Sequence, residues 1–520
     1  MRSSCRKYPG LGTLAAWLGP GAAIAGVALA AGCGSSSATN APTGDDGGSD
    51  SSSSCDTTQD PSTTPCLVSE AYGVFVSTMG SDATGDGSRA KPYATFGKGL
   101  DAAKAAGKQV FVCMGIYPEN VTVDAAHDGV SVHGGFSCTD WSYAATNAVK
   151  LAPQDPGPAV RVDTLSTGTT ITDLEIDSVD AQKAGDSSIA AFVNASHNVV
   201  FRRVTMRSGN GAAGAAGADG ASMSNYDVSL MPSDPKIAGN GAPTLTGGAA
   251  QTCSGLCANG MTSTGGAGAS YGSGLPGSNG GPSIPENPPG QTPKHDGAGG
   301  AAGVCAGTGR GGPGDPGASG AQVQGGIAAT SPGALSSTGW TPTDGHPGEV
   351  GGVGQGGGGG GAGCDNGATA GGGGGGGCGG CGGTEGGGGH GGGSSFALVS
   401  VASPLVLDAC TLVAGNGGDG GAGGAGQPGQ KGGLGGTIPQ GSAGAAGGAG
   451  GDGAGGSGGG GGSGGLSIAV AYSGPAPTAT NGTRASVGNP GHGGAGGTGT
   501  TATNAGGPGL DGIAVENKGF

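Results

Sequence analysis

Aromatic and charged side chains are both scarce in this chain of 520 residues. Aromatic residues make up 4% of it and charged residues 11%. Neither large side chains nor surface charge can therefore set the architecture. Disorder driven by charge repulsion is also a poor fit, because sequences of that class are rich in charge.

Glycine is abundant instead, with 133 residues, about a quarter of the chain, where ordinary composition gives about 7%. The glycine is concentrated in long segments rather than spread evenly. This argues against a conventional packed enzyme over much of the length, and length alone is a poor guide to the number of domains.

The amino-terminal segment carries no charge from residue 8 to residue 44, and basic residues precede this window. Small residues stand directly before Cys33. The pattern predicts a bacterial lipoprotein signal over residues 1–32, with Cys33 as the lipidated residue; an ordinary secretory signal with an alanine-rich cleavage site is the alternative. Glycine and proline interrupt the apolar run, so a retained transmembrane helix is disfavoured.

Basic residues are few, since 20 lysines and arginines face 35 acidic residues and the formal net charge is −15. Nucleic acid is therefore excluded as a partner, because phosphate binding needs clustered basic side chains. Membrane attachment is expected to come from acyl chains. We expect a location in the cell envelope, at the outer membrane or the cell surface.

Residues 33–66 are rich in serine and aspartate and read as a flexible tether. Residues 67–208 hold short β-branched runs separated by turn residues, which predict strands near residues 74–76, 110–113, 121–123, 130–132, 159–162, 171–176 and 199–206. One helix is expected after Thr95 as its N-cap, and Gly107 supplies its end.

Three segments share one apolar pattern: residues 171–176, 201–206 and 407–412. A pattern that recurs once per turn predicts a solenoid. Residues 188–211 also match 394–417 without a gap, at an offset of 206 residues, and a partial third copy follows. This places further coils at residues 394–414 and 466–487, and a glycine-rich tail with a possible closing strand at 488–520.

Glycine-rich inserts separate these coils at residues 209–393 and 415–465. Glycine occupies every third position from 417 to 465, with Ile438 as the one exception. A three-residue period predicts extended threefold helices, and we expect bundles of polyglycine-II helices joined by backbone hydrogen bonds. A flexible linker is the alternative, and partial disorder is expected where the period weakens, at about 223–296. The bundle would place one set of residues along an edge: Asp419, Ala422, Ala425, Leu434 and Ala449.

The chain has 13 cysteines, and export to an oxidising compartment makes disulfides the expected state. The pairs expected from short separation are Cys55 with Cys66, Cys113 with Cys138, and Cys253 with Cys257. Cys378 and Cys381 have the spacing of a redox or zinc half-site, but no helix can hold them in a polyglycine run, so a structural bridge is favoured. Pairing of the remaining cysteines stays open.

Four segments of the first coils, residues 80–88, 91–96, 115–119 and 134–136, resemble the start of right-handed parallel β-helix proteins of the pectin-lyase-like class. The resemblance implies an all-β fold whose helix covers the open end of the solenoid. The inserts resemble those of glycine-rich bacterial surface proteins, including the mycobacterial class. The whole arrangement is similar to large surface lipoproteins of soil and marine predatory bacteria.

Members of this class that cleave acidic polysaccharides carry Ca²⁺-binding aspartates and an arginine base on an outer sheet. The resemblance implies these candidates for such a site: Asp173, Asp177, Arg202, Arg203 and Arg207. The alternative follows from stacking the coils, which sets Asp173 opposite Arg203 and Asp177 opposite Arg207 as an ion-pair ladder. The ladder is favoured because the third copy does not continue a carboxylate cluster.

Asp82 and Asp86 stand among glycines and could supply oxygen ligands to Ca²⁺. The spacing differs from that of an EF-hand, and a turn explains the same residues. We expect a turn there.

We therefore expect a lipid-anchored surface protein with a structural or adhesive role and without catalytic residues, cofactor or metal. Its expected partners are the membrane, through the lipid, and extracellular polysaccharide or matrix. The alternative is a secreted carbohydrate-active β-helix enzyme, a lyase or hydrolase, that uses the glycine segments for display.

Overall fold

The computed structural model describes residues 55–221, 245–250, 257, 262–273, 275–282, 297, 309–364 and 370–520. All of them belong to one compact unit, Cys55–Phe520. The expected signal peptide, Cys33, Cys253 and most of the stretch expected to be disordered lie outside the described residues. No helix in the described part of the chain has the length and apolar character needed to cross a membrane.

Short strands stack in parallel to form three sheets. The first sheet holds β1 (Gly73–Val76), β2 (Gln109–Cys113), β5 (Val132–Phe136), β8 (Thr169–Thr172), β11 (Val199–Arg202), β16 (Leu405–Asp408) and β19 (Thr478–Thr480). The second holds β4 (Val121–Val123), β7 (Val160–Asp163), β10 (Ser188–Asn194), β15 (Ser395–Val401), β18 (Ser467–Ser473) and β21 (Ala514–Gly519). The third holds β3 (Gly115–Tyr117), β6 (Val149–Leu151), β9 (Glu175–Asp177), β12 (Thr205–Arg207), β17 (Thr411–Val413) and β20 (Arg484–Ser486). The fold is a right-handed parallel β-helix.

The interior of the coils is a continuous apolar column. Phe201 pairs with Ile171 on one side and with Leu407 on the other, so coils from distant parts of the sequence share one register. Both neighbours and Phe201 belong to one buried cluster. The expectation that residues 201 and 407 lie in the same inner column is confirmed.

Each expected long run is divided into two strands by a corner. Asp173, Arg203 and Ala409 have positive φ angles of 57°, 52° and 55° and stand between a strand of the first sheet and one of the third. A single left-handed residue turns the chain sharply. The predicted runs 171–176 and 199–206 are therefore each two strands.

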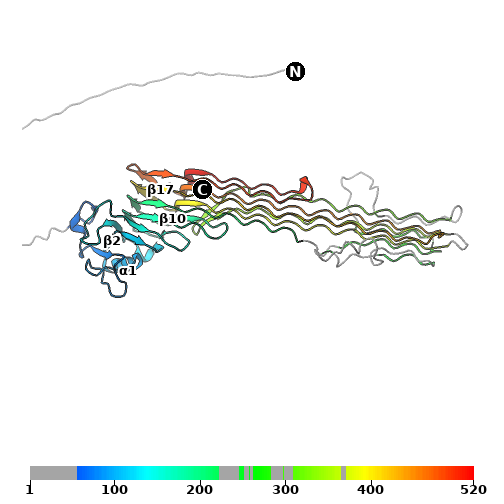
Figure 1. The fold of residues 1–520 in the computed structure, drawn as a ribbon, viewed down its shortest axis with the longest axis horizontal. Helices are drawn as coiled ribbons and strands as arrows, with labels where there is room; N and C mark the ends of the chain where they lie inside the picture. The colour runs from blue at the N-terminus through cyan, green and yellow to red at the C-terminus, as the bar shows by residue number, and fades with distance from the viewer. Residues whose placement is uncertain are drawn as a thin grey trace, which may run out of the picture. The chain divides into compact units, whose positions relative to one another are not determined.

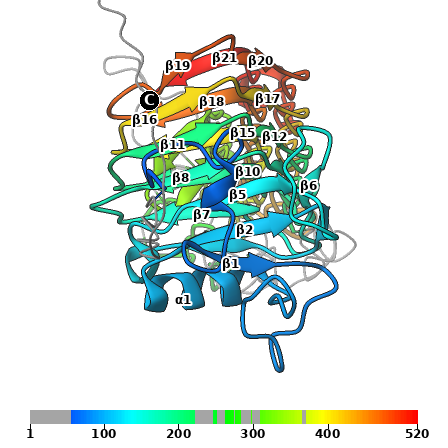
Figure 2. The ribbon, with the colours of Figure 1, turned by 90° about the vertical axis from the view of Figure 1, so that its left-hand side faces the viewer.

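Helix α1 (Phe96–Ala106) covers the end of the solenoid beside β1, and Figure 2 shows it there, with β19, β20 and β21 at the opposite end of the stack. Thr95 caps the helix by accepting a hydrogen bond from the Lys98 amide, and Gly107 ends it with a φ of 65°. The predicted helix, its cap and its stop are confirmed.

Every long excursion starts after a strand of the third sheet and rejoins the solenoid at a strand of the second. The chain leaves after β12, β17 and β20 and returns at β15, β18 and β21. The excursions are thus enlarged loops at one corner, and in Figure 1 they run side by side away from the coils. β21 is the closing strand expected in the tail, and it pairs with β18.

The sequence alignment predicts that equivalent residues of two coils are 206 positions apart throughout, and this is wrong for one pair of strands. β11 and β16 pair with that offset, but β10 and β15 pair with an offset of 207, as Ser188 with Ser395. The connection from β15 to β16 is one residue shorter than that from β10 to β11. A turn can lose a residue without disturbing the strands it joins, which an ungapped alignment does not register.

Two further segments pack against the coils. Residues 55–66, expected to belong to the tether, lie instead within the compact unit, so that expectation is corrected for this part. The antiparallel hairpin β13 (Gly333–Ser336) and β14 (Gly339–Pro342) extends from the first insert. Its Trp340 packs on the outer face of the second sheet against Phe396, with ring centroids 5.5 Å apart.

Short 3₁₀ turns complete the described elements: η1 (Pro65–Leu67), η2 (Ala125–His127) and η4 (Ala502–Asn504).

Candidate functional site

The expected disulfides occur in part. Bonds join Cys55 to Cys66 and Cys113 to Cys138. Cys257 bonds to Cys381, 124 residues further along, so neither a Cys253–Cys257 bridge nor a Cys378–Cys381 bridge forms. Cys378 and Cys364 are also disulfide-bonded, and Cys410 is a buried free thiol. The two pairs outside the bundle are thus as expected, whereas the expected partner of Cys257 is wrong because the bundle brings remote segments together.

The aspartates considered for Ca²⁺ build the cap of the solenoid. Asp82 accepts hydrogen bonds from the amides of Ala94 and Thr95, at 2.7 and 3.2 Å. Asp86 accepts one from the Ser88 amide at 3.0 Å, which closes a turn. No group of three metal-ligating side chains occurs among the described residues. The expected turn accounts for the Asp86 carboxylate, whereas the Asp82 carboxylate instead binds backbone amides just before α1.

Glu119, from the motif that carries the resemblance, also supports the cap. Its carboxylate accepts a hydrogen bond from the Phe96 amide at 2.9 Å, at the positive end of α1. Burial raises the pKa of Glu119 in spite of this bond. The motif residues therefore hold the end helix in place.

Arg202 and Arg203 gather acidic residues at a corner of the solenoid. Arg203 makes a bidentate pair with Asp173 at 2.7 and 2.8 Å, and Arg202 binds Asp408 at 2.8 Å. Both arginines also contact Asp60, at 2.9 and 3.4 Å. The predicted pair of Asp173 with Arg203 is confirmed. Asp60 adds a further carboxylate from a segment that was expected to be a flexible tether.

The Asp60 carboxylate at this corner is held in its charged form. Burial acts to raise the pKa of Asp60, but hydrogen bonds from Arg203 and Ser62 leave that pKa well below its usual range. The Asp173 carboxylate in turn raises the pKa of Arg203. Charged groups that neutralise one another in this way form a structural cluster rather than a set poised to exchange protons.

His133 lies buried on the first sheet beside this cluster. Its Nδ1 is 3.0 Å from the Thr172 hydroxyl, and its Nε2 is buried with no hydrogen-bond partner. Burial lowers the pKa of His133 to about 4. The imidazole is therefore neutral at pH 7.

The other predicted pair lies on the outer face of the third sheet. Arg207 contacts Asp177 and Glu175, each at 3.3 Å, and Lys150 contacts Asp177 at 2.6 Å. The five residues brought forward by the resemblance are thus divided between two places. Asp173, Arg202 and Arg203 lie together at the corner, whereas Asp177 and Arg207 form a separate half-exposed ladder.

A ladder of side-chain oxygens marks the corner from which the excursions leave. The Asp180 carboxylate accepts from the Asn210 amide, the Asn210 side chain from the Asn416 amide, and the Asn416 side chain from the Asn489 amide, at 2.6 to 2.8 Å. Successive coils are thereby joined at the point where strands give way to glycine segments. The repeated Gly-Asn pair in the sequence is the signal for this ladder.

The glycine segments form a bundle held together through the backbone. In the second insert the amides of Gly417, Gly420, Gly423 and Gly426 donate to carbonyls of residues 489, 492, 495 and 498 at 2.7 to 2.9 Å. The amides one position further on, at residues 418, 421 and 424, donate to a different neighbour at residues 393, 390 and 387. Each third of the residues faces its own neighbour, which is the threefold geometry of polyglycine II.

Side chains are excluded where these segments meet. A Cβ atom on Gly386 would overlap the carbonyl of Gly424, and one on Gly389 would overlap that of Gly421. The three-residue glycine period is therefore required by the close packing of the segments. A flexible linker would have no such requirement.

The remaining third of the positions faces outward on three adjacent segments. Segments 211–220, 416–425 and 489–498 run in parallel, joined by hydrogen bonds at every third residue. Their outward residues, here called the small-residue face, are Ala213, Ala216, Asp219, Asp419, Ala422, Ala425, His492, Ala495 and Thr498. Of the edge predicted from the sequence, Asp419, Ala422 and Leu434 are exposed, whereas Ala425 and Ala449 are half-buried.

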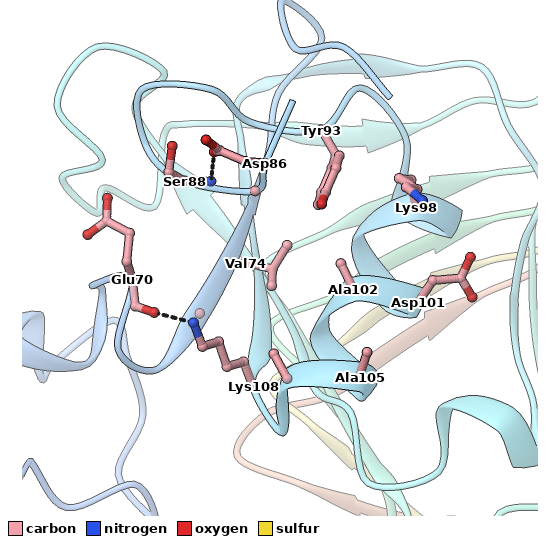
Figure 3. Close-up of a pocket in the computed structure, with 13 residues that line it drawn as sticks. Glu70, Val74, Asp86, Ser88, Tyr93, Lys98, Asp101, Ala102, Ala105 and Lys108 are labelled. Atoms are coloured by element: carbon pink, nitrogen blue, oxygen red, sulfur yellow. Dashed lines mark hydrogen bonds between the residues drawn. The ribbon is translucent and has the colours of Figure 1, made fainter. Parts of the chain in front are cut away.

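A cavity of about 590 Å³ opens between α1 and β1, at the capped end of the solenoid. Figure 3 shows the Tyr93 side chain above it, Lys98 and Asp101 on the helix side, and Glu70 and Asp86 on the opposite side. Neither the composition nor any motif indicated this cavity.

No model of a protein family matches this chain. No curated protein matches it either. Among solved structures, it is similar to the pectin methylesterase of Aspergillus niger in its penultimately deglycosylated form, with 17% identity over 27% of this chain and 44% of that chain, at a TM-score of 0.19. It is also similar to the pectin methylesterase from carrot, with 14% identity over 27% of this chain and 53% of that chain, at a TM-score of 0.15. The chain spans about half the length of these structures.

Proposed function

We propose that this chain is a lipid-anchored protein of the cell surface, with a structural or adhesive role and without catalysis. The observation that carries the proposal is the bundle, in which backbone hydrogen bonds join segments from all three excursions. A bundle built this way presents side chains at fixed spacing on a stiff support, which limits the entropy lost on contact with a partner.

The pairing of charges supports a role without catalysis. Asp60, Asp173 and Asp408 each accept bonds from an arginine. At the end cap, Asp82 binds the Ala94 amide just before α1, and Glu119 binds the first amide of the helix. Among the described residues, these charged groups are engaged in contacts that stabilise the fold. Extracellular polysaccharide or matrix is the proposed partner, because the small-residue face consists mainly of alanines with a few polar side chains, which suits broad contact better than ionic recognition.

Two experiments test this function. Lipidation at Cys33 is expected to give labelling with radioactive palmitate that the Cys33→Ala variant loses. Attachment of cells to polysaccharide-coated surfaces should fall when Ala216, Ala422 and Ala495 are each changed to lysine, whereas three lysines placed at the exposed residues Thr122, Thr478 and Ser486 of the coils should leave it unchanged. Equal attachment by both variants would contradict an adhesive role for the small-residue face.

One observation favours the enzymatic alternative, namely the unpartnered Nε2 of His133 beside the arginine corner. A carbohydrate-active enzyme would turn over acidic glycans through such a corner. We expect the full chain to release no product from a panel of polyuronates, and release that the Arg203→Ala variant loses would replace our proposal with this alternative.

A further inference from the structure

We infer that the cavity between α1 and β1 binds one unit of an uncharged saccharide. The inference concerns the capped end of the solenoid and stands whether or not the bundle is adhesive. Four features support it: the size of the cavity, its apolar floor, the hydroxyl of Tyr93 and the balance of charge around the rim.

The cavity has the dimensions and floor of a small-molecule site. Its volume of about 590 Å³ lies within the range of about 300 to 1,000 Å³ that is usual for ligand pockets. Val74 and three alanines of α1, Ala102, Ala105 and Ala106, line it with apolar surface. The C–H face of a sugar ring can pack on such a floor, and the absence of large side chains there leaves room for it.

Tyr93 offers an aromatic ring and a free hydroxyl. Its amide donates to the Phe75 carbonyl at 3.0 Å and its carbonyl accepts from the Ser77 amide at 2.9 Å, so the backbone that carries the ring is fixed. The Lys98 ammonium lies 5.8 Å from the ring centroid. Among the described residues no group hydrogen-bonds to the Tyr93 hydroxyl, and Figure 3 shows the side chain pointing into the cavity.

The rim carries both signs of charge in nearly equal number. Three carboxylates, of Glu70, Asp86 and Asp101, face two ammonium groups, of Lys98 and Lys108. Asp101 is already 3.2 Å from His127, and Lys108 donates to the Glu70 carbonyl at 2.6 Å. The carboxylates would repel a polyanion, and the lysines would repel a cation. The hydroxyls of a neutral sugar can instead donate hydrogen bonds to the carboxylates and accept them from the lysines.

The walls of the cavity are held in place before any ligand arrives. The loop side is closed by hydrogen bonds from the Gly87 amide to the Lys91 carbonyl and from the Phe75 amide to the Gly87 carbonyl, at 3.0 and 2.9 Å. The helix side is fixed by the caps at Thr95 and Glu119. A rigid site loses less entropy on binding, which favours even a small ligand.

Calorimetry with the full chain tests the inference. The probes are hexasaccharides of glucose, mannose and N-acetylglucosamine, with trigalacturonate as the charged comparison. We expect one neutral probe to bind with one site per chain. Ala102→Trp, which fills the cavity, should weaken that binding more than about tenfold, and Tyr93→Phe, which removes only the hydroxyl, by several-fold. Lys104→Ala on the same helix is the matched control and should bind like the unchanged chain.

Circular dichroism of each variant separates loss of the site from loss of the fold. Absence of binding by all neutral probes would overturn the inference, as would binding that survives both Ala102→Trp and Tyr93→Phe. Tighter binding of trigalacturonate than of any neutral probe would also overturn it, because the rim would then select charge. None of these outcomes bears on attachment through the small-residue face, which is measured with different variants.

Discussion

The coils and the bundle reach stability by opposite means. In the coils, side chains from three sheets fill a continuous apolar interior, with Phe201 between Ile171 and Leu407. In the bundle, glycine segments approach until their backbones touch, and amides such as that of Gly386 donate to carbonyls of neighbouring segments. Burial of apolar area holds the first region, and satisfaction of backbone polar groups holds the second.

This difference determines what each region tolerates. A core of side chains accepts another apolar residue of similar volume at small loss. A contact between backbones accepts no added atom, because the overlap falls on a carbonyl that cannot rotate away. Ordering glycine also costs more backbone entropy than ordering any other residue. The bundle must therefore form nearly all of its hydrogen bonds, whereas the coils can lose a contact and persist.

The sharpest way to break the comparison is Gly386→Val at a buried position of the bundle. Its Cβ would overlap the Gly424 carbonyl, and the hydrogen bond from the Gly386 amide to Ser457 at 2.9 Å would be strained. We expect a loss of more than about 5 kcal/mol in the stability of the bundle, because no rotamer relieves a backbone overlap. Amide hydrogen exchange should show lost protection in residues 372–393 and 417–465 and retained protection in the coils.

Ala422→Val is the matched control, since Ala422 points outward from the same bundle. It adds two methyl groups without meeting a neighbouring segment, and we expect no change in exchange. If Gly386→Val behaved like Ala422→Val, the segments would not be in backbone contact.

The corresponding change in the coils is Phe201→Ala. Phe201 is fully buried, so truncation leaves a cavity, and we expect a loss of about 3 to 5 kcal/mol by urea unfolding. Phe201→Leu, which restores most of the volume, should lose less than about 2 kcal/mol. Equal losses from the two substitutions would mean that the coils, like the bundle, depend on shape alone.

Acidification is expected to weaken the coils before the bundle. Burial lowers the pKa of His133 to about 4 from 6.5, so the unfolded chain binds the proton more readily. The stabilising contribution is therefore complete above pH 6.5 and is lost as the pH falls toward 4, by roughly 3 kcal/mol in total. Asp60, whose pKa is lowered, keeps its charge throughout this window.

Urea unfolding at several pH values measures this effect. The His133→Gln variant should be less sensitive to pH between 6.5 and 4, and bundle amides should keep their exchange rates in both proteins. Persistence of the full pH dependence in His133→Gln would assign it to other groups.

Much of the course of the backbone could be predicted, because it depends on sequence patterns that repeat at fixed intervals. The threefold glycine phase from residue 417 predicts parallel extended segments, and the recurrence of residues 171–176 at 201–206 and 407–412 predicts the coil register. The pairing of Asp173 with Arg203 followed from that register alone. Signals of this kind repeat along the chain, so each copy supports the others.

Contacts between remote segments could not be predicted, because they depend on how the segments pack. Cys257 meets Cys381 only after the first insert has folded into the bundle. Asp60 reaches the arginine corner from a segment whose composition indicates a linker, although the cysteines on either side of it hinted at a closed loop. The cavity beside Tyr93 arises where a helix and a loop meet, which leaves no pattern in the sequence.

A smaller effect is expected where the two regions join. Asn416→Ala removes the oxygen that accepts the Asn489 amide at 2.8 Å, and we expect a loss of about 1 kcal/mol. Faster exchange of the Asn489 amide measures it. Asn416→Asp should restore the acceptor, as Asp180 already serves one position along the same ladder. A loss of equal size in both variants would show that the amide group, rather than its oxygen, is needed.

The smallest effect is expected for Arg207→Ala on the outer face of the third sheet. The Arg207 side chain is 44% exposed and its contacts with Glu175 and Asp177 are each 3.3 Å long, so water and salt screen them. We expect a loss of less than about 1 kcal/mol, and a still smaller one in 0.5 M NaCl. Urea unfolding at both salt concentrations measures it, with Arg203→Ala as the comparison, because Arg203 is less exposed and bidentate with Asp173. Equal losses from Arg207→Ala and Arg203→Ala at high salt would contradict this prediction. Ion pairs on the exposed face of the third sheet would then stabilise the coils as strongly as the ion pairs at the corner.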